Sequence, residues 1–111
     1  IGNKLFYGCI SLTDITLPDG ITSIGGSAFS GCKVLAGITI PSSVTEIGWS
    51  AFRDCSSLIS IKISSSVTEI GESAFSGCSS LTSINVPANK TNYYKERLSK
   101  ELHQFIVEMD M

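Results

Sequence analysis

The sequence is poor in charge and has no long apolar run. Lys and Arg number 8, Asp and Glu number 10, and charged residues make up 16% of the 111 residues. A formal net charge of −2 provides no basic stripe for a phosphate backbone, which argues against nucleic acid as a partner. No stretch approaches the roughly 20 apolar residues that span a bilayer, so we expect no membrane span in this chain.

The chain also lacks an initiator methionine and a signal pattern. Ile1 falls in the middle of a repeat, and no charged segment followed by an apolar one is found at the N-terminus. We therefore expect a mature product or part of a longer chain, with any targeting signal upstream.

Histidine occurs once, as His103. The repeat geometry puts no Ser or Cys beside it, so a nucleophile–base pair is not expected. We interpret His103 as an ordinary surface residue of the C-terminal segment.

Three residue types recur with a period of 23. The recurring positions are Phe6, Phe29, Phe52 and Phe75, then Cys9, Cys32, Cys55 and Cys78, then Leu12, Leu35, Leu58 and Leu81. A fixed period in this range is typical of a solenoid, in which each repeat is one coil that buries its apolar side against its neighbours.

Each coil contains two short apolar segments. The first alternates inward and outward with period two, as in Ile38-Thr39-Ile40, which predicts a strand. Pro18, Pro41 and Pro87 follow it, and the second segment is the apolar pair Ile21/Ile24, Val44/Ile47 or Val67/Ile70. Stacked coils would then build two parallel sheets.

Glycine and serine recur after the second strand. Gly2, Gly25, Gly48 and Gly71 predict a positive φ at a corner where a Cβ would be strained. Ser27, Ser50 and Ser73 stand where an N-cap belongs, and the following Ala-Phe-x-x-Cys has helical spacing. We therefore predict a short helical corner, partly 3₁₀.

The composition changes from Asn92 onward. The sequence there predicts a helix with Leu98 and Leu102 on one face, followed by a strand over 105–109. Val107 lies 23 residues after Ile84, so we predict that these two pair, as would Met109 and Val86. The charged residues of this degenerate last coil would cover the open end of the core.

The repeated string V-T-E-I-G, followed by S-A-F-x-x-C-S-S-L and I-x-I, resembles the BspA-type leucine-rich repeat family. The string recurs in 44–63 and 67–86, and the resemblance covers residues 1 to about 89. The tail looks like the terminal cap common in members from gut Bacteroidetes. The resemblance implies a right-handed α/β solenoid on secreted or surface-anchored proteins, associated with adhesion and without a shared catalytic site.

The predicted fold is therefore an α/β leucine-rich repeat solenoid of 23-residue coils, with parallel strands, short helical corners and a C-terminal capping helix. Residues 1–89 would form about four repeat coils and residues 90–111 the cap, together making a single domain.

The four cysteines are predicted to be buried free thiols in one ladder. Equivalent positions in adjacent coils point the same way, roughly 4.8 Å apart, outside the usual Cβ window of about 3.5–4.5 Å for a disulfide. A disulfide is the alternative. Four thiols in a line do not converge on a tetrahedral zinc ion, so no metal site is expected.

Glu46 and Glu69 stack in one column. A paired-carboxylate acid/base site is conceivable, but an open corner without a cleft favours two solvated carboxylates.

Two surfaces depart from repetition and are candidates for binding. The outward positions of the first strand form a flat hydrogen-bonding face that includes Asp14, Thr16, Thr39, Ser60, Lys62 and Asn85. The second candidate is Trp49 with Arg53 and Asp54, a composition typical of an interface anchor. Trp49 could equally lie over Gly26 and fill the gap left by its missing side chain.

The sequence thus predicts a noncatalytic binding module of a cell-surface or secreted protein, with a protein or a glycan as partner. No cofactor, metal ligand or catalytic residue is assigned. A structural spacer that displays another domain is the alternative, and an enzyme is a third. The first coil has no predicted cover, so self-association through its edge is also expected.

Overall fold

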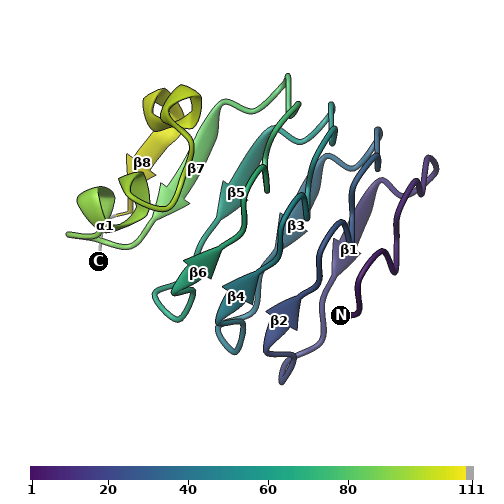
Figure 1. Cartoon of the computed structure of the whole chain (residues 1–111), viewed down its shortest axis with the longest axis horizontal. Helices are drawn as coiled ribbons and strands as arrows, with labels where there is room; N and C mark the ends of the chain where they lie inside the picture. The colour runs from purple at the N-terminus through teal and green to yellow at the C-terminus, as the bar shows by residue number, and fades with distance from the viewer. Residues whose placement is uncertain (110–111) are drawn as a thin grey trace.

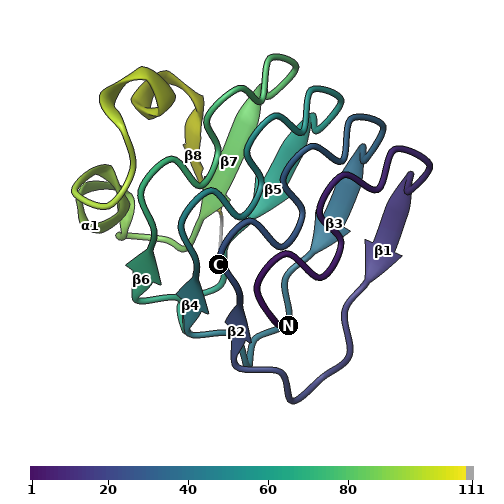
Figure 2. The same ribbon diagram turned by 45° about the vertical axis from the view of Figure 1, so that its right-hand side comes forward.

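Two parallel sheets line a stack of coils in the computed structural model, which describes residues 1–109 (Figure 1). The five-stranded sheet has the order β1-β3-β5-β7-β8, formed by Asp14–Thr16, Gly37–Thr39, Ser60–Lys62, Ser83–Val86 and Ile106–Glu108. The three-stranded sheet has the order β2-β4-β6, formed by Ser23–Ile24, Glu46–Ile47 and Glu69–Ile70. Figure 2 shows the two sheets as separate rows of strands. The predicted pair of parallel sheets is confirmed.

The register of the strands follows the sequence period. Asp14 pairs with Gly37, Ser60 with Ser83, and Ser23 with Glu46. In a strand, successive side chains point to opposite faces, so every coil sends the same apolar residues inward. Ile61 and Ile84, for example, are buried in the centre.

The phenylalanine column forms the central stack of the core. The ring centroids of Phe6, Phe29, Phe52 and Phe75 lie 5.2, 5.4 and 5.5 Å apart in succession, and the interplanar angles are at most 12°. The predicted column is confirmed.

The predicted helical corners are wrong, because the segment after the second strand is a series of turns. Ala28 N–H donates to Gly25 C=O at 3.2 Å, which closes a turn, whereas Ser27 N–H donates across to Trp49 C=O of the next coil at 2.8 Å. Such alternation of local and inter-coil bonds excludes a helix, in which every N–H bonds within its own segment. The serines predicted to be N-caps instead have a left-handed backbone conformation, with φ of 56°, 54° and 60° at Ser27, Ser50 and Ser73.

The recurring glycine is required for a different reason from the one predicted. Gly25, Gly48 and Gly71 do not have positive φ values. A Cβ at Gly25 would lie 2.6–2.7 Å from backbone atoms of residues 1–3, and at Gly48 it would lie 2.6 Å from Gly26 N. Glycine is therefore needed because the backbones of neighbouring coils approach closely at this corner.

The last coil is one residue shorter than the others. Ile84 pairs with Ile106 and Val86 with Glu108, so the predicted pairings of Val107 with Ile84 and of Met109 with Val86 are both wrong by one position. The shift arises because α1 (Thr91–Lys95) and the 3₁₀ helix η1 (Lys100–Phe105) replace the second strand and the turns. The single helix predicted from Asn92 is thus two short helices, and Leu98 between them is buried as expected.

Candidate binding surfaces

The outward side chains of the five-stranded sheet gather around one shallow hollow. The pairings Asp14–Gly37, Thr39–Lys62 and Lys62–Asn85 place the predicted residues in two adjacent columns. The hollow has a volume of about 520 Å³, and all six predicted strand-face residues, Asp14, Thr16, Thr39, Ser60, Lys62 and Asn85, line it.

Most of the side chains that line this hollow are polar. Hydroxyl groups of Thr16, Thr39 and Ser60 offer donors and acceptors, and Asn85 adds an amide, half-buried where the others are exposed. Asp14 and Lys62 supply one charge of each sign on different strands. The surface can therefore accept hydrogen-bonding groups of a partner over several coils, and it holds no cluster of titratable groups that would support acid–base chemistry.

Trp49, Arg53 and Asp54 lie away from the hollow. Trp49 follows β4 of the three-stranded sheet and is 52% exposed. Arg53 Nε and Asp54 Oδ2 are 3.9 Å apart, with both side chains more than half exposed, an arrangement that contributes little free energy. The two predicted surfaces are thus separate.

Trp49 packs over Gly26, as one of the two alternatives predicted, and whether it also anchors a partner stays a prediction. The indole lies over Gly26, which it buries, and it remains half exposed to solvent. The sequence alone does not decide between packing and exposure, because one part of the ring can pack over the glycine while the other part stays exposed.

The cysteines form a ladder of free thiols, as predicted. Sγ–H of Cys32, Cys55 and Cys78 donates to the carbonyls of Phe6, Phe29 and Phe52, each at 3.1 Å. Cys32 and Cys55 are fully buried, whereas Cys9 and Cys78 at the two ends are half-buried, so the expectation of four buried thiols is wrong for those two.

Burial makes three of the four thiols poor nucleophiles. Desolvation raises the pKa of Cys55 to about 12 and that of Cys78 to about 11, and it also raises the pKa of Cys32. Because the thiolate is the reactive form, these groups are inert near neutral pH.

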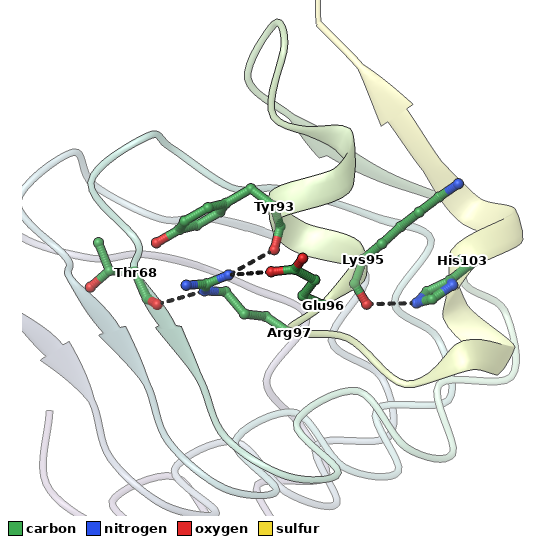
Figure 3. Close-up of polar contacts among 6 residues, drawn as sticks. All are labelled: Thr68, Tyr93, Lys95, Glu96, Arg97 and His103. Atoms are coloured by element: carbon green, nitrogen blue, oxygen red, sulfur yellow. Dashed lines mark hydrogen bonds and ion pairs between the residues drawn. The ribbon is translucent and has the colours of Figure 1, made fainter.

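The remaining chemical candidates do not assemble into a centre. Glu46 pairs in register with Glu69, and both are exposed. His103 is half-buried, and its Nε2 lies 2.8 Å from Lys95 C=O (Figure 3) and 3.1 Å from Leu98 C=O. Within residues 1–109, no group of three or more His, Cys, Asp or Glu could hold a metal ion.

Two residues that the sequence did not single out close the C-terminal end. In the regular coils, Thr45 C=O accepts from Thr68 N–H of the next coil at 2.9 Å. Thr68 C=O instead accepts from Arg97 Nε at 2.9 Å, and the guanidinium lies 3.5 Å from the ring centroid of Tyr93 (Figure 3). The Arg97 side chain thus takes the place of a backbone donor.

Tyr94 also reaches back, on the inner side, where its hydroxyl takes the place of a side-chain donor. Its hydroxyl donates toward Val67 C=O at 2.8 Å and toward Ser64 C=O at 3.1 Å, and the side chain is 1% exposed. In the preceding coil, Ser66 Oγ donates to Val44 C=O at 2.8 Å. The sequence signal for these two residues is the loss of the repeat at Tyr93-Tyr94. It marks the point from which side chains take over bonds that a regular coil would make.

Comparison with known proteins gives one family. A model of the BspA type leucine rich repeat region matches residues 1–106 in six copies. No curated protein matches the chain. No helix within residues 1–109 is long and apolar enough to cross a membrane.

Similar solved structures are bacterial leucine-rich repeat proteins. A leucine-rich repeat protein from Bacteroides ovatus is 35% identical over 98% of this chain, with a TM-score of 0.83. A leucine rich cell surface protein from Faecalibacterium prausnitzii is 39% identical over 77% of the chain (TM-score 0.74), and a leucine rich repeat protein of T. pallidum is 34% identical over 77% (TM-score 0.63). The chain covers 28%, 22% and 50% of those structures, respectively.

Proposed function

We propose a noncatalytic binding function for this chain, which belongs to the BspA-type leucine-rich repeat family. Its strand face would bind a protein on the surface of another cell, and the chain would belong to a cell-surface or secreted protein. The observation that best supports the proposal is that six polar side chains, whose types differ from coil to coil, line one hollow of an otherwise repetitive sheet. The description of the F. prausnitzii structure as a cell surface protein supports the location.

Chemistry of the hollow favours recognition over catalysis. It presents hydroxyl and amide groups with one acid and one base on separate strands, a set that suits hydrogen bonding to a folded or extended partner. Cys32 and Cys55 have raised pKa values and lie in the core, which makes them poor nucleophiles.

A cell-binding assay with a charge-reversal pair tests this proposal. We would add fluorescently labelled chain to several cell types and compare Lys62→Glu with Lys33→Glu. Both lysines are exposed and both changes alter net charge equally, but Lys33 does not line the hollow. We expect Lys62→Glu to lose most of the cell-bound signal and Lys33→Glu to keep it.

The treatment of the cells separates the alternatives. Trypsin shaving should abolish binding if the partner is a protein, whereas periodate oxidation should abolish it if the partner is a glycan. A structural spacer would show no saturable binding to any cell type, and that outcome would overturn the proposal.

The proposal extends to the two ends of the stack. Residues 90–111 would act as a cap over the repeat coils of residues 1–89, supported by the Arg97 and Tyr94 bonds; Asp110 and Met111 lie outside the described residues. The first coil exposes Leu5, Tyr7 and Ile10 at 60%, 60% and 68%, which supports self-association there. Light scattering across a concentration series would show a rising mass if it occurs.

A further inference from the structure

One column of the turn surface lacks a side chain at a single coil. Its members are Asn3, Gly26, Trp49 and Glu72, spaced by the repeat period. Asn3 and Glu72 are exposed, but Gly26 is buried, because the indole of Trp49 lies over it. The absence of a Cβ at Gly26 therefore determines where the indole can lie.

The space around Gly26 differs in kind from that around the repeated glycines. A Cβ at Gly26 would come within 3.0 Å of Cε2, Nε1 and Cζ2 of Trp49, all of which belong to a side chain. A Cβ at Gly48 or Gly71 would instead meet backbone atoms of the preceding coil. Stacking of the coils thus requires glycine at 48 and 71, whereas the three atoms closest to a Cβ at 26 all belong to the indole.

The backbone of Gly26 is itself held in place. Its N–H donates to Asn3 Oδ1 at 2.7 Å, and its C=O accepts from Lys4 N–H at 2.9 Å. The platform below the indole is consequently fixed to the first coil. One part of the ring rests on this platform while 52% of the residue stays open to solvent.

We infer that Gly26 is a positioning residue, which holds the indole of Trp49 in one half-exposed orientation suited to anchoring a protein partner. The inference rests on the proposed binding function and adds Trp49 as a second, preorganised contact point, separate from the strand face. An aromatic ring that is already immobile loses little conformational entropy when a partner covers it. Large rigid aromatic side chains are also the residues that dominate interface energetics.

The single tryptophan makes the inference measurable without any partner. We would compare Gly26→Ala with Gly37→Ala by time-resolved fluorescence anisotropy and iodide quenching. Gly37 is the matched control, because a Cβ there meets no atom within 4 Å. Far-UV circular dichroism establishes that both variants keep the fold.

Wild type and Gly37→Ala should show an indole that tumbles with the whole protein. Gly26→Ala should add a fast local component and roughly double the iodide quenching constant, because about half of the residue is covered in the wild type. Anisotropy decay and quenching that are the same in Gly26→Ala as in Gly37→Ala would overturn the inference.

A double-mutant cycle tests whether Gly26 acts through the indole. The urea midpoint shift caused by Gly26→Ala should vanish when Trp49 is already alanine, with unfolding followed by circular dichroism. An equal shift in both backgrounds would mean that the added methyl group strains the backbone, and it would overturn the inference. Neither measurement involves a partner, so their outcome is independent of the cell-binding assay for the proposed function.

Discussion

The first and third coils carry the same residue types at the same repeat positions but bury them differently. Phe6 stacks on one ring and is half-buried, whereas Phe52 stacks on two rings and is 0% exposed. Cys55 is likewise buried and bonded to Phe29 C=O, while Cys9 is half-buried. Burial in this fold is therefore set by the neighbouring coils rather than by the residue's own coil.

The C-terminal end shows how the last regular coil is covered by a segment that lacks the repeat. Arg97 and Tyr94 reach back from the cap segment and donate to Thr68 C=O and Val67 C=O. The C-terminal segment thus supplies side-chain donors to the two residues just before β6 (Glu69–Ile70), and the last regular coil keeps its Phe75 at 1% exposure. We therefore predict that the same substitution lowers the free energy of unfolding by different amounts in different coils.

The largest expected difference is between Phe52→Ala and Phe6→Ala. Phe52→Ala leaves a cavity between two stacked rings and should lower the free energy of unfolding by about 3–5 kcal/mol. Phe6→Ala removes a half-buried ring with one stacked neighbour and should cost less than half as much. Urea denaturation of both variants, followed by circular dichroism, measures the two costs.

The control for this pair is the slope of the denaturation curve. If both variants keep the wild-type m-value, the difference in midpoint reports stability alone. Equal costs at Phe6 and Phe52 would contradict the view that neighbours on both sides determine burial.

The next largest effect is expected at the cap, with Tyr94→Phe. This change keeps the buried ring but leaves Val67 C=O without the hydroxyl donor, whereas Ser64 C=O still accepts from Val67 N–H. An unsatisfied buried acceptor costs about 1–3 kcal/mol. Tyr93→Phe is the matched control, because the Tyr93 ring contacts the Arg97 guanidinium through its face. Thermal unfolding should show a lower midpoint for Tyr94→Phe than for Tyr93→Phe, and the reverse order would contradict the role assigned to the Tyr94 hydroxyl.

The thiol ladder predicts a loss of stability at alkaline pH. Burial raises the pKa of Cys55 from 9.0 to about 12, so the unfolded chain ionises this thiol at a lower pH than the folded chain. The stabilising contribution is present in full below pH 9 and declines as the pH rises toward 12. At one pH unit above 9.0 the loss is about 1.4 kcal/mol for this one group.

Cys55→Ala isolates the effect, since every other titrating group is shared with the wild type. Urea midpoints recorded at pH 8 and pH 10 should fall further for the wild type than for Cys55→Ala. An identical fall in both proteins would show that the Cys55 thiol ionises equally in the folded and unfolded chains.

The repeat explains how much of this structure could be predicted from sequence. Positions such as Ile38, Phe52 and Cys55 recur in every coil, so their burial and the parallel sheets follow from stacking alone. The membership of the strand face also follows, because alternation in a strand fixes which of Thr39 and Ile38 points outward.

What could not be predicted depends on the distances between coils. The left-handed Ser27 and the close approach at Gly48 arise from hydrogen bonds and contacts with residues about one period away, which local propensity does not encode. The one-residue shift of Val107 followed from a cap segment whose length the repeat does not set. The shallow hollow around Lys62 is likewise a property of adjacent side chains rather than of any motif.

The smallest expected effect again compares equivalent positions, at the turn where one coil departs from the others. Asp54 has a φ of 60°, and the same position in the other coils is Gly8, Gly31 or Gly77, with φ of 70–78°. A left-handed conformation is strained for a residue with a Cβ and free of strain for glycine. Relief of about 1–2 kcal/mol of left-handed strain, less the roughly 0.5–1 kcal/mol of extra chain entropy that glycine loses on folding, should raise the free energy of unfolding of Asp54→Gly by up to about 1 kcal/mol. The exposed ion pair with Arg53 that is lost contributes little. Arg53→Ala breaks the same ion pair without relieving the backbone strain and should leave the urea midpoint nearly unchanged.

A lower midpoint for Asp54→Gly than for Arg53→Ala would mean that the Asp54 carboxylate, which lies against Gly77, stabilises the turn by more than its backbone strain costs.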